Sequence, residues 1–298
     1  MMVIYIKKHD AHAGKWIYKG YELAWEKQGY KVEYYNILED LPPCKGDYYI
    51  MAVDSDVRGS VALESIARAV KAFVFVQPNS FPAPWGTHPN FKCLCPDIYI
   101  QALNSLENVH LWTFADVNPF YNRWENVKTL PLAFDSISYK EDLDKKYEFD
   151  ICYIGGWANN GFGEKRKIMI NFFSKISKMD IKCGVFIDKN LTHEQENKIL
   201  SNTRIPINIH DAYQQKLGYD TNERTFKSLG LNGFLISDKV SQLERIFPLV
   251  PTAEDPKQMC EMIEQNLQKD LASIKLQNRR LVRQHHSYIQ RVSEMVAW

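Results

Sequence analysis

The segment Asn222-Glu223-Arg224-Thr225-Phe226 places an arginine near the start of a helix expected over Arg224–Leu229. Asn222 is a residue type that caps helix N-termini, and the bare N–H groups there favour anions. A guanidinium beside them would add a charged fork suited to a diphosphate. A capped helix whose arginine pairs with Glu or Asp is the alternative, and the residues alone slightly favour it.

A second phosphate signal follows the strand expected at Phe149–Ile154. The strand ends at the turn Gly155-Gly156-Trp157, and the next expected helix, Glu164–Lys178, begins with Lys165 and Arg166. Glycine admits close backbone approach and two cations at a helix start favour phosphate. An ordinary solvated first turn of a helix explains the pattern about equally well.

Candidate general bases follow strands of the first half. Asp10 comes soon after the strand expected at Val3–Ile6 and precedes Gly14, a point where a phosphate could approach. His12 is the second choice and Asp54 the third. Each could deprotonate a hydroxyl from a strand end, and each could instead cap a turn.

The segment Gln77–Asn90 is rich in proline and aromatic residues and is too long for a simple connection. Its aromatic rings could stack on a sugar or a base, although packing against the sheet is at least as common. We expect acceptor contacts from Trp16, Asn79 and Trp85.

Asp54-Ser55-Asp56 has the Asp-x-Asp form that holds a divalent cation on a diphosphate in some transferases. A three-residue match is frequent by chance, and the Arg224 segment does not fit the fold that uses it. We therefore expect no metal site and no required cofactor, with Arg224, Lys165 and Arg166 neutralising the diphosphate.

Strands and helices alternate through both halves, which predicts parallel sheets with covering helices. The chain of 298 residues suits two domains. The polar segment Asp135–Glu148 is the expected linker, so the domains are 1–138 and 148–284. A last helix is expected at about Leu271–Met295, and its end, about 285–298, is expected to pack back on the first domain.

The composition is that of a soluble protein, with 45% hydrophobic residues and a net charge of +1, so no global field attracts nucleic acid. No apolar run approaches the roughly 20 residues of a membrane span. Six cysteines without a zinc spacing predict a reducing, cytoplasmic setting.

The stretch Asn222–Asp238 resembles the C-terminal signature of CgeB-like, group 1 glycosyltransferases, in which Arg-Thr-Phe-Glu precedes a Gly-Phe/Ala-Leu-Leu-x-Asp strand. Phe149–Gly156 with Lys165-Arg166, and His286-Ser287-Tyr288 with Arg291, are also similar. The resemblance covers about half the chain. It implies an α/β GT-B fold of two Rossmann-like domains with a cleft between them. The implied donor site contains Gly14, Gly155, Gly156, Trp157, Lys165, Arg166, Arg224, Thr225 and Lys227.

One position departs from the family pattern. The family places after Arg-Thr-Phe a Glu that contacts the donor ribose, and this sequence has Lys227. A lysine cannot accept a hydrogen bond from a ribose hydroxyl. Either Glu223 substitutes, Lys227 meets a phosphate, the donor is unusual, or activity is weak or lost.

The first half is similar to the acceptor domain of phage DNA β-glucosyltransferases, on Tyr48–Ser55, Ala72–Val76 and the proline-rich segment. Those enzymes carry a catalytic Asp after the fourth strand, where this sequence reads Gln77-Pro78-Asn79-Ser80, so the base is not carried over.

The resemblances imply transfer from a nucleoside diphosphate sugar, UDP-sugar favoured, to a hydroxyl of a glycan. A hydroxymethylated base in DNA is the alternative acceptor. A non-catalytic nucleotide-sugar-binding protein and a sugar-nucleotide epimerase are the rivals.

Overall fold

The computed structural model describes residues 1–298 except 10–11, 42–46, 80, 82–92 and 158–163. The chain divides into two compact units, one of residues 1–131 with 288–298 and one of residues 132–287. All of the expected linker, Asp135–Glu148, therefore belongs to the second unit. Its backbone is bound there, because the N–H groups of Asp142 and Asp144 donate to Ser201 and Asn202.

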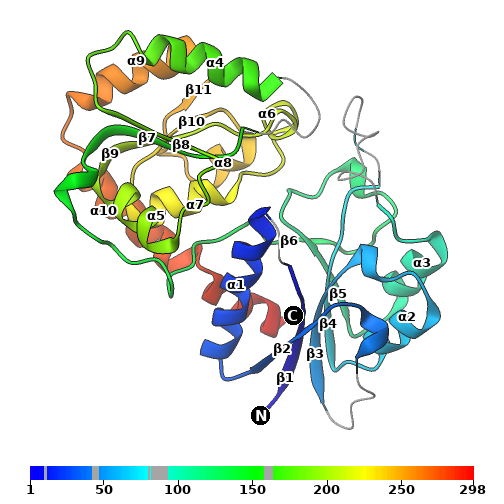
Figure 1. The fold of residues 1–298 in the computed structure, drawn as a ribbon. Helices are drawn as coiled ribbons and strands as arrows, with labels where there is room; N and C mark the ends of the chain where they lie inside the picture. Colours follow the sequence, from blue (N-terminus) through cyan, green and yellow to red (C-terminus); the bar gives the residue numbers. More distant parts are fainter. Residues whose placement is uncertain (10–11, 42–46, 80, 82–92, 158–163) are drawn as a thin grey trace. The chain divides into compact units, whose positions relative to one another are not determined.

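The first unit holds a six-stranded parallel sheet in the order β2-β1-β3-β4-β5-β6. The strands are β1 (Val3–Lys7), β2 (Lys31–Tyr35), β3 (Tyr48–Val53), β4 (Lys71–Phe75), β5 (Val109–Thr113) and β6 (Lys128–Thr129). Helices α1 (His12–Lys27) and α11 (Tyr288–Ala297) cover one face, and α2 (Ser60–Ala67) and α3 (Asp97–Ser105) cover the other (Figure 1). Short 3-10 turns occur at Leu38–Asp40, Asp54–Asp56 and Pro119–Tyr121.

An aromatic layer fixes α1 and α11 to this sheet. The ring of Tyr21 on α1 lies 5.7 Å from that of Trp112 on β5 and 4.9 Å from that of Tyr288 on α11. A Cβ on Gly20 would lie only 2.3 Å from the Tyr288 ring, so a glycine is needed for this approach. The high aromatic content of the sequence thus serves the core of this unit.

The second unit holds a five-stranded parallel sheet in the order β11-β10-β9-β7-β8. The strands are β7 (Phe149–Gly155), β8 (Cys183–Ile187), β9 (Thr203–Asn208), β10 (Ile236–Asp238) and β11 (Thr252–Ala253). The helices are α4 (Glu164–Ile176), α5 (His193–Asn202), α6 (Ala212–Leu217), α7 (Glu223–Leu231), α8 (Ser241–Ile246), α9 (Pro256–Leu267) and α10 (Ala272–His285), with a 3-10 turn at Lys145–Tyr147.

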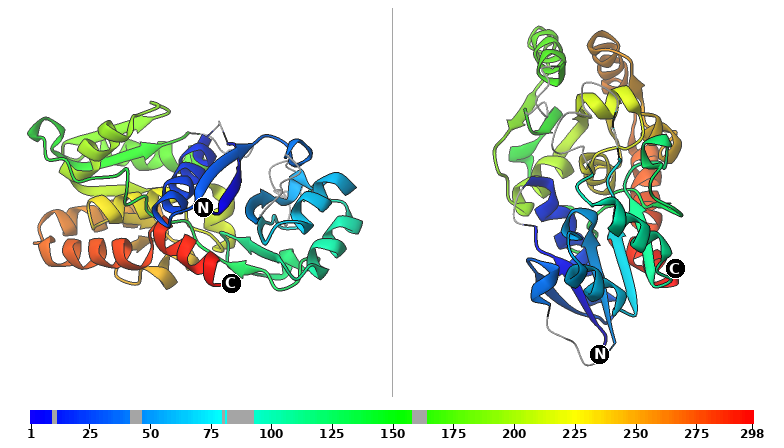
Figure 2. Two further views of the ribbon diagram at one scale, coloured as in Figure 1. Left: turned by 90° about the horizontal axis from the view of Figure 1, so that it is seen from below. Right: turned by 90° about the vertical axis from the view of Figure 1, so that its right-hand side faces the viewer.

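Helices α4 and α9 lie side by side on one face of this sheet, and α5, α7 and α10 cover the other (Figures 1 and 2). The core under α4 and α9 is aliphatic and aromatic, with Met169, Phe172 and Ile263 fully buried. On the other face, Gly230 of α7 lets Phe134 pack against the helix, because a Cβ there would lie 2.5 Å from the ring.

The last helix expected from the sequence is two helices. The chain leaves the helical path after α10 because the carbonyl of His286 accepts the N–H of Phe134, at 2.8 Å, and Ser287 forms a bridge with Phe134. The shorter elements α3, α6, α8 and β11 were not predicted. Among the described residues, no helix is long and apolar enough to cross a membrane.

Candidate functional site

The carboxyl edge of the second sheet has a switch point between β7 and β9. The chain leaves β7 for β8 on one side, and β9, β10 and β11 continue on the other. In open parallel sheets, ligands bind at the carboxyl ends of the strands where the order reverses. The residues that end β7 and β9 are therefore the first place to look for a site.

Arg224, the second residue of α7, extends its guanidinium to this switch point. The group lies over the ring of Tyr153, 4.9 Å from its centroid, and Nη1 donates to Asn208 Oδ1 at 2.8 Å and to the carbonyl of Ile209 at 3.2 Å. Nη2 and Nε donate to no residue that the structure describes. The side chain is half-buried. A partly desolvated fork with free donors is a bidentate site for a phosphate or carboxylate.

Gly155 makes this position possible. A Cβ on Gly155 would lie 2.1 Å from Nη2 of Arg224 and 2.6 Å from its Cζ, so any other residue would displace the guanidinium. The carbonyl of Gly156 accepts the hydroxyl of Tyr153 at 3.1 Å, which holds the ring beneath Arg224. The structure thus brings together two of the predicted features, the glycine turn and the arginine. The first glycine gives room to the arginine itself.

The start of α7 lies beside the same edge. Asn222 caps the helix, since its Oδ1 accepts the N–H of Thr225 at 3.3 Å. The capping that the sequence predicts is therefore present, but Arg224 forms none of the described ion pairs with Glu or Asp that the alternative required. Helix polarity and the guanidinium act in the same sense, and both favour an anion.

Lys165 and Arg166, predicted to join this cradle, are engaged elsewhere. The Lys165 amino group is buried and lies 2.6 Å from Asp211 Oδ1. The exposed Arg166 guanidinium lies over the ring of Trp157, 5.4 Å from its centroid. A lysine that neutralises a carboxylate stabilises the start of α4 and adds little net charge for a ligand.

Two buried polar residues at neighbouring strand ends were missed. His210 follows β9 and its Nδ1 lies 2.5 Å from Oδ1 of Asp238, the last residue of β10. Burial opposes ionisation of Asp238, but its Coulombic interaction with His210 and its hydrogen bonds from His210 and Gln215 outweigh burial and lower the pKa of the carboxyl below its usual value. Polar residues ending two adjacent buried strands were the signal in the sequence.

Asp54 directly follows β3 in the first unit and is fully buried. Its Oδ2 accepts the N–H of Gln77 at 2.9 Å and the thiol of Cys93 at 3.6 Å, while Oδ1 has no partner among the described residues. Burial raises the pKa of Asp54 to about 6. Asp54 thus binds Gln77, which begins the long segment Gln77–Asn90, and Cys93, which follows it. These contacts indicate a structural role for Asp54 and argue against its predicted role as a base.

The comparisons with known proteins fit this architecture. A model of the family described as glycosyl transferase-like matches residues 142–297, more than half of the chain. The chain belongs to this family. It is a glycosyltransferase of the GT-B fold, with two parallel-sheet α/β domains. No curated protein matches the sequence.

Similar solved structures span the whole chain at low identity. HepE from Anabaena, solved with UDP, matches with a TM-score of 0.59 at 8% identity and covers 100% of both chains. An α-glucosyltransferase solved with UDP and a 13-mer DNA containing an HMU base has a TM-score of 0.56 at 11% identity, over 99% of this chain and 98% of that chain. AviGT4, a glycosyltransferase involved in avilamycin A biosynthesis, has a TM-score of 0.52 at 10% identity, and the match covers 100% of this chain and 96% of that chain. The DNA enzyme is an α-glucosyltransferase, whereas the sequence resemblance was to the β-enzymes.

Lys227, where this glycosyltransferase departs from the family signature, does not reach the switch point. Its amino group lies 3.0 Å from Glu196 Oε2 and 3.6 Å from Glu223 Oε2, and 5.2 Å from the centroid of the Tyr139 ring. Burial opposes its charge, but the two carboxylates outweigh this and raise the pKa of Lys227. The interpretation of Lys227 as a phosphate ligand is therefore not supported.

Thr225 also differs from its predicted role as a donor contact. Its side chain is fully buried, and its hydroxyl lies 2.7 Å from that of Thr221 and accepts Nδ2 of Asn208 at 3.0 Å. The hydroxyl therefore belongs to the packing behind Arg224.

The remaining predictions lie in the first unit. Asp10 and Trp85 lie outside the described residues, as does the side chain of His12, which begins α1. A Cβ on Gly14 would lie 3.4 Å from the ring of His9. Trp16 is half-buried, with Lys15 over its ring, and Asn79 Oδ1 accepts the N–H of Arg123 at 3.1 Å.

The described residues contain no cluster of three or more His, Cys, Asp or Glu that could hold a metal ion. Asp56, the second carboxylate of the Asp-x-Asp match, is paired with Lys7 at 3.0 Å.

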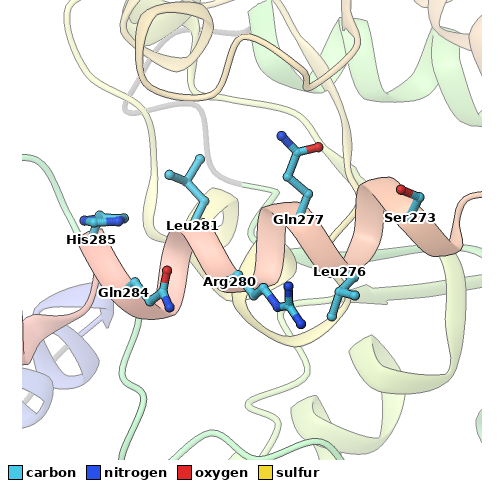
Figure 3. Close-up of a pocket in the computed structure, with 7 residues that line it drawn as sticks. All are labelled: Ser273, Leu276, Gln277, Arg280, Leu281, Gln284 and His285. Atoms are coloured by element: carbon cyan, nitrogen blue, oxygen red, sulfur yellow. The ribbon is translucent and has the colours of Figure 1, made fainter.

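A hollow of about 370 Å³ lies along the outer face of α10 (Figure 3). All seven lining residues come from that one helix, and none belongs to the switch point: Ser273, Leu276, Gln277, Arg280, Leu281, Gln284 and His285. We assign it no part in the site.

Proposed function

We propose that this glycosyltransferase transfers a sugar from a nucleoside diphosphate sugar to an acceptor hydroxyl, with the donor diphosphate held by Arg224. The observation that carries this is the half-buried guanidinium at the switch point, with Nη2 and Nε free of described partners. UDP is the favoured nucleotide, because HepE and the DNA α-glucosyltransferase were both solved with it.

Charge develops on the leaving diphosphate as the glycosidic bond breaks. A fixed guanidinium and the N-terminus of α7 would stabilise that charge without reorganisation, which is the usual form of electrostatic catalysis. We propose that this replaces a divalent cation. Transfer that persists at full rate in excess chelator supports this, and transfer that requires added Mg²⁺ or Mn²⁺ contradicts it.

The first unit is proposed to present the acceptor, with Asp10 or His12 as the base. Asp54 ranks below both, because its carboxylate is buried and hydrogen-bonded. The expected result for Asp10→Asn is loss of transfer with unchanged UDP affinity. Loss with His12→Gln alone would assign the base to His12.

The acceptor is proposed to be a glycan. The net charge of +1 is low for a protein that neutralises many DNA phosphates. DNA with a modified base is the second candidate, favoured by the structural likeness to the DNA α-glucosyltransferase. Binding of a duplex that weakens steeply with salt would support DNA, and no binding at low salt would exclude it.

The five described cysteines are free thiols, which fits the proposed cytoplasmic location.

The deciding experiment is a thermal-shift screen of the full chain against UDP, GDP, dTDP and CMP, followed by transfer and hydrolysis assays with the matching sugars. A nucleotide that binds the folded state raises its unfolding temperature. Arg224→Ala should weaken UDP binding about 100-fold, the value of a bidentate charged contact. Wild-type affinity in a folded Arg224→Ala protein contradicts the donor site, and UDP binding without transfer or hydrolysis of any donor supports a non-catalytic binding protein.

A further inference from the structure

A chain of buried polar side chains runs behind Arg224. Asn208, at the end of β9, accepts Nη1 of Arg224 on its Oδ1 at 2.8 Å and donates Nδ2 to Thr225 Oγ1 at 3.0 Å. Nδ2 also donates to Oδ1 of Asn222 at 3.1 Å. The Oδ1 atom also accepts Nδ2 of Asn222 at 3.0 Å, so the amide oxygen is shared between the helix cap and the arginine.

The chain continues from Thr225 to a buried acid. The Thr225 and Thr221 hydroxyls are 2.7 Å apart, Thr221 Oγ1 lies 2.8 Å from His210 Nε2, and His210 Nδ1 lies 2.5 Å from Asp238 Oδ1. The backbone N–H of His210 also donates to Asp238, at 2.8 Å. Asn208, Thr225, Thr221 and His210 are at most 1% exposed, and Asp238 is 6% exposed.

The acid at one end fixes the proton on the ring nitrogen of His210 that faces it. An ionised Asp238 only accepts, so His210 donates from Nδ1. When His210 is neutral and carries its proton on Nδ1, Nε2 accepts the hydroxyl of Thr221, and Thr221 in turn accepts the hydroxyl of Thr225. The Thr225 oxygen is then left to accept the amide N–H of Asn208.

The amide oxygen of Asn208 must consequently face Arg224. The opposite orientation would set the –NH₂ group against the guanidinium, so that two donors face each other and Nη1 keeps only the carbonyl of Ile209 as an acceptor, which is costly in a buried place. With the oxygen there, Nη1 is occupied by Asn208 and by the carbonyl of Ile209, and Nη2 and Nε are the donors left for a ligand.

We propose that Asn208, oriented by the chain Thr225–Thr221–His210–Asp238, is the residue that positions the Arg224 guanidinium for the donor diphosphate. This rests on the proposed function of Arg224. Asn208 and the residues behind it are positioning residues, because none of them contacts the ligand and they act through the arginine.

The test is a double-mutant cycle on UDP affinity, measured by calorimetry on the full chain. Asn208→Ala should weaken UDP binding about tenfold, since a hydrogen bond to a charged group is lost. In an Arg224→Ala background, Asn208→Ala should have no further effect on UDP affinity. Asn278→Ala is the matched control. Asn278 is a buried asparagine of the same unit that donates to the carbonyl of Gly233, and its loss should lower the unfolding temperature without changing UDP affinity.

A second pair of variants tests the chain behind Asn208. Thr225→Val removes the hydroxyl at constant shape and should weaken UDP binding several-fold, and Thr225→Ser should restore it. Equal affinity for Thr225→Val and Thr225→Ser overturns the role of the chain, and additive effects of Asn208→Ala and Arg224→Ala overturn the role of Asn208. If Arg224→Ala itself leaves UDP affinity unchanged, the proposed donor site fails, and the positioning role that rests on it is overturned with it.

Discussion

The two sheets of this protein have the same kind of switch point, but their charged residues are used differently. In the first unit the reversal lies between β1 and β3, where Lys7 pairs with Asp56 at 3.0 Å and Asp54 is buried against Gln77 and Cys93. In the second it lies between β7 and β9, where Arg224 keeps donors free of described partners. Parallel topology thus gives each sheet a switch point at which a ligand can bind. The side chains at that point determine whether a charged group is available to bind it.

The second unit also separates structural charges from the charge available to a ligand. Lys165 and Lys227 are each buried against carboxylates, whereas Arg224 is held by neutral oxygens and an aromatic ring. A cation that is held by neutral groups keeps its full charge for an anion. Variants of these residues can test which charges are neutralised by carboxylates and which are available to a ligand.

The largest effect is expected from restoring the glutamate of the family signature. Lys227→Glu would place a third carboxylate beside Glu196 and Glu223, with no cation left between them. Breaking a buried ion pair costs about 3–5 kcal/mol, so we expect a loss of this size in the free energy of unfolding, measured with urea.

The charge-reversed variant Lys227→Glu with Glu196→Lys is the control for this change. It restores one opposite pair and should recover a large part of the lost stability. A Lys227→Glu protein as stable as the wild type would show that Lys227 is not committed to these carboxylates.

A smaller effect, confined to a pH window, is expected at Asp54. Its pKa is raised from 3.8 to about 6, so between these values the folded state binds more protons than the unfolded state and stability falls as the pH rises. The Asp54→Asn variant lacks this titrating carboxyl. The stability of this variant relative to the wild type should therefore increase by up to about 3 kcal/mol from pH 4 to pH 7, and then stay level.

Urea unfolding of both proteins at four or five pH values measures this difference, because the other titrating groups are shared. Asp56→Asn is the matched variant. It removes a carboxylate that is paired with Lys7, and burial raises its pKa although that pairing opposes the rise, so its pH-dependent difference from the wild type should have the same sign and be smaller. A pH-independent difference between Asp54→Asn and the wild type contradicts the burial of a protonatable Asp54.

Gly155→Ala is expected to weaken UDP binding about tenfold, because its Cβ would displace Arg224 without removing its charge. Gly59→Ala is the control in the first unit, where a Cβ would meet only Glu39, at 3.9 Å. Calorimetry measures the UDP affinity of both variants. Unchanged UDP affinity in Gly155→Ala would mean that the observed position of Arg224 is not the one that binds the nucleotide.

Much of the fold could be predicted from the sequence, because long buried strands such as β3 and capped helices such as α9 carry strong local patterns. The break between α10 and α11 could not. It depends on Phe134, more than 150 residues earlier in the chain, which binds the carbonyl of His286. Short elements such as β11, with two residues, have too few positions to show a period.

The site could be predicted in part, because some of its residues stand in local motifs. Arg224 and Gly155 each stand in a recognisable local motif, a helix start and a glycine turn. The fate of Lys227 depends on Glu196 and Tyr139, which come from other elements, so its sequence position gave no sign of its partners. The role of Asn208 depends in the same way on four residues of three separate segments.

The smallest effect is expected at Arg166, which was predicted to bind the diphosphate beside Lys165. Its guanidinium is exposed and lies over Trp157, so water and salt screen its charge. Arg166→Ala should weaken UDP binding less than about threefold at 0.15 M salt, and the effect should shrink further at higher salt. Calorimetry at two salt concentrations measures both quantities. A loss as large as that of Arg224→Ala, independent of salt, would mean that Arg166 leaves Trp157 and contacts the bound diphosphate, so that the available charge of this unit is shared by two arginines.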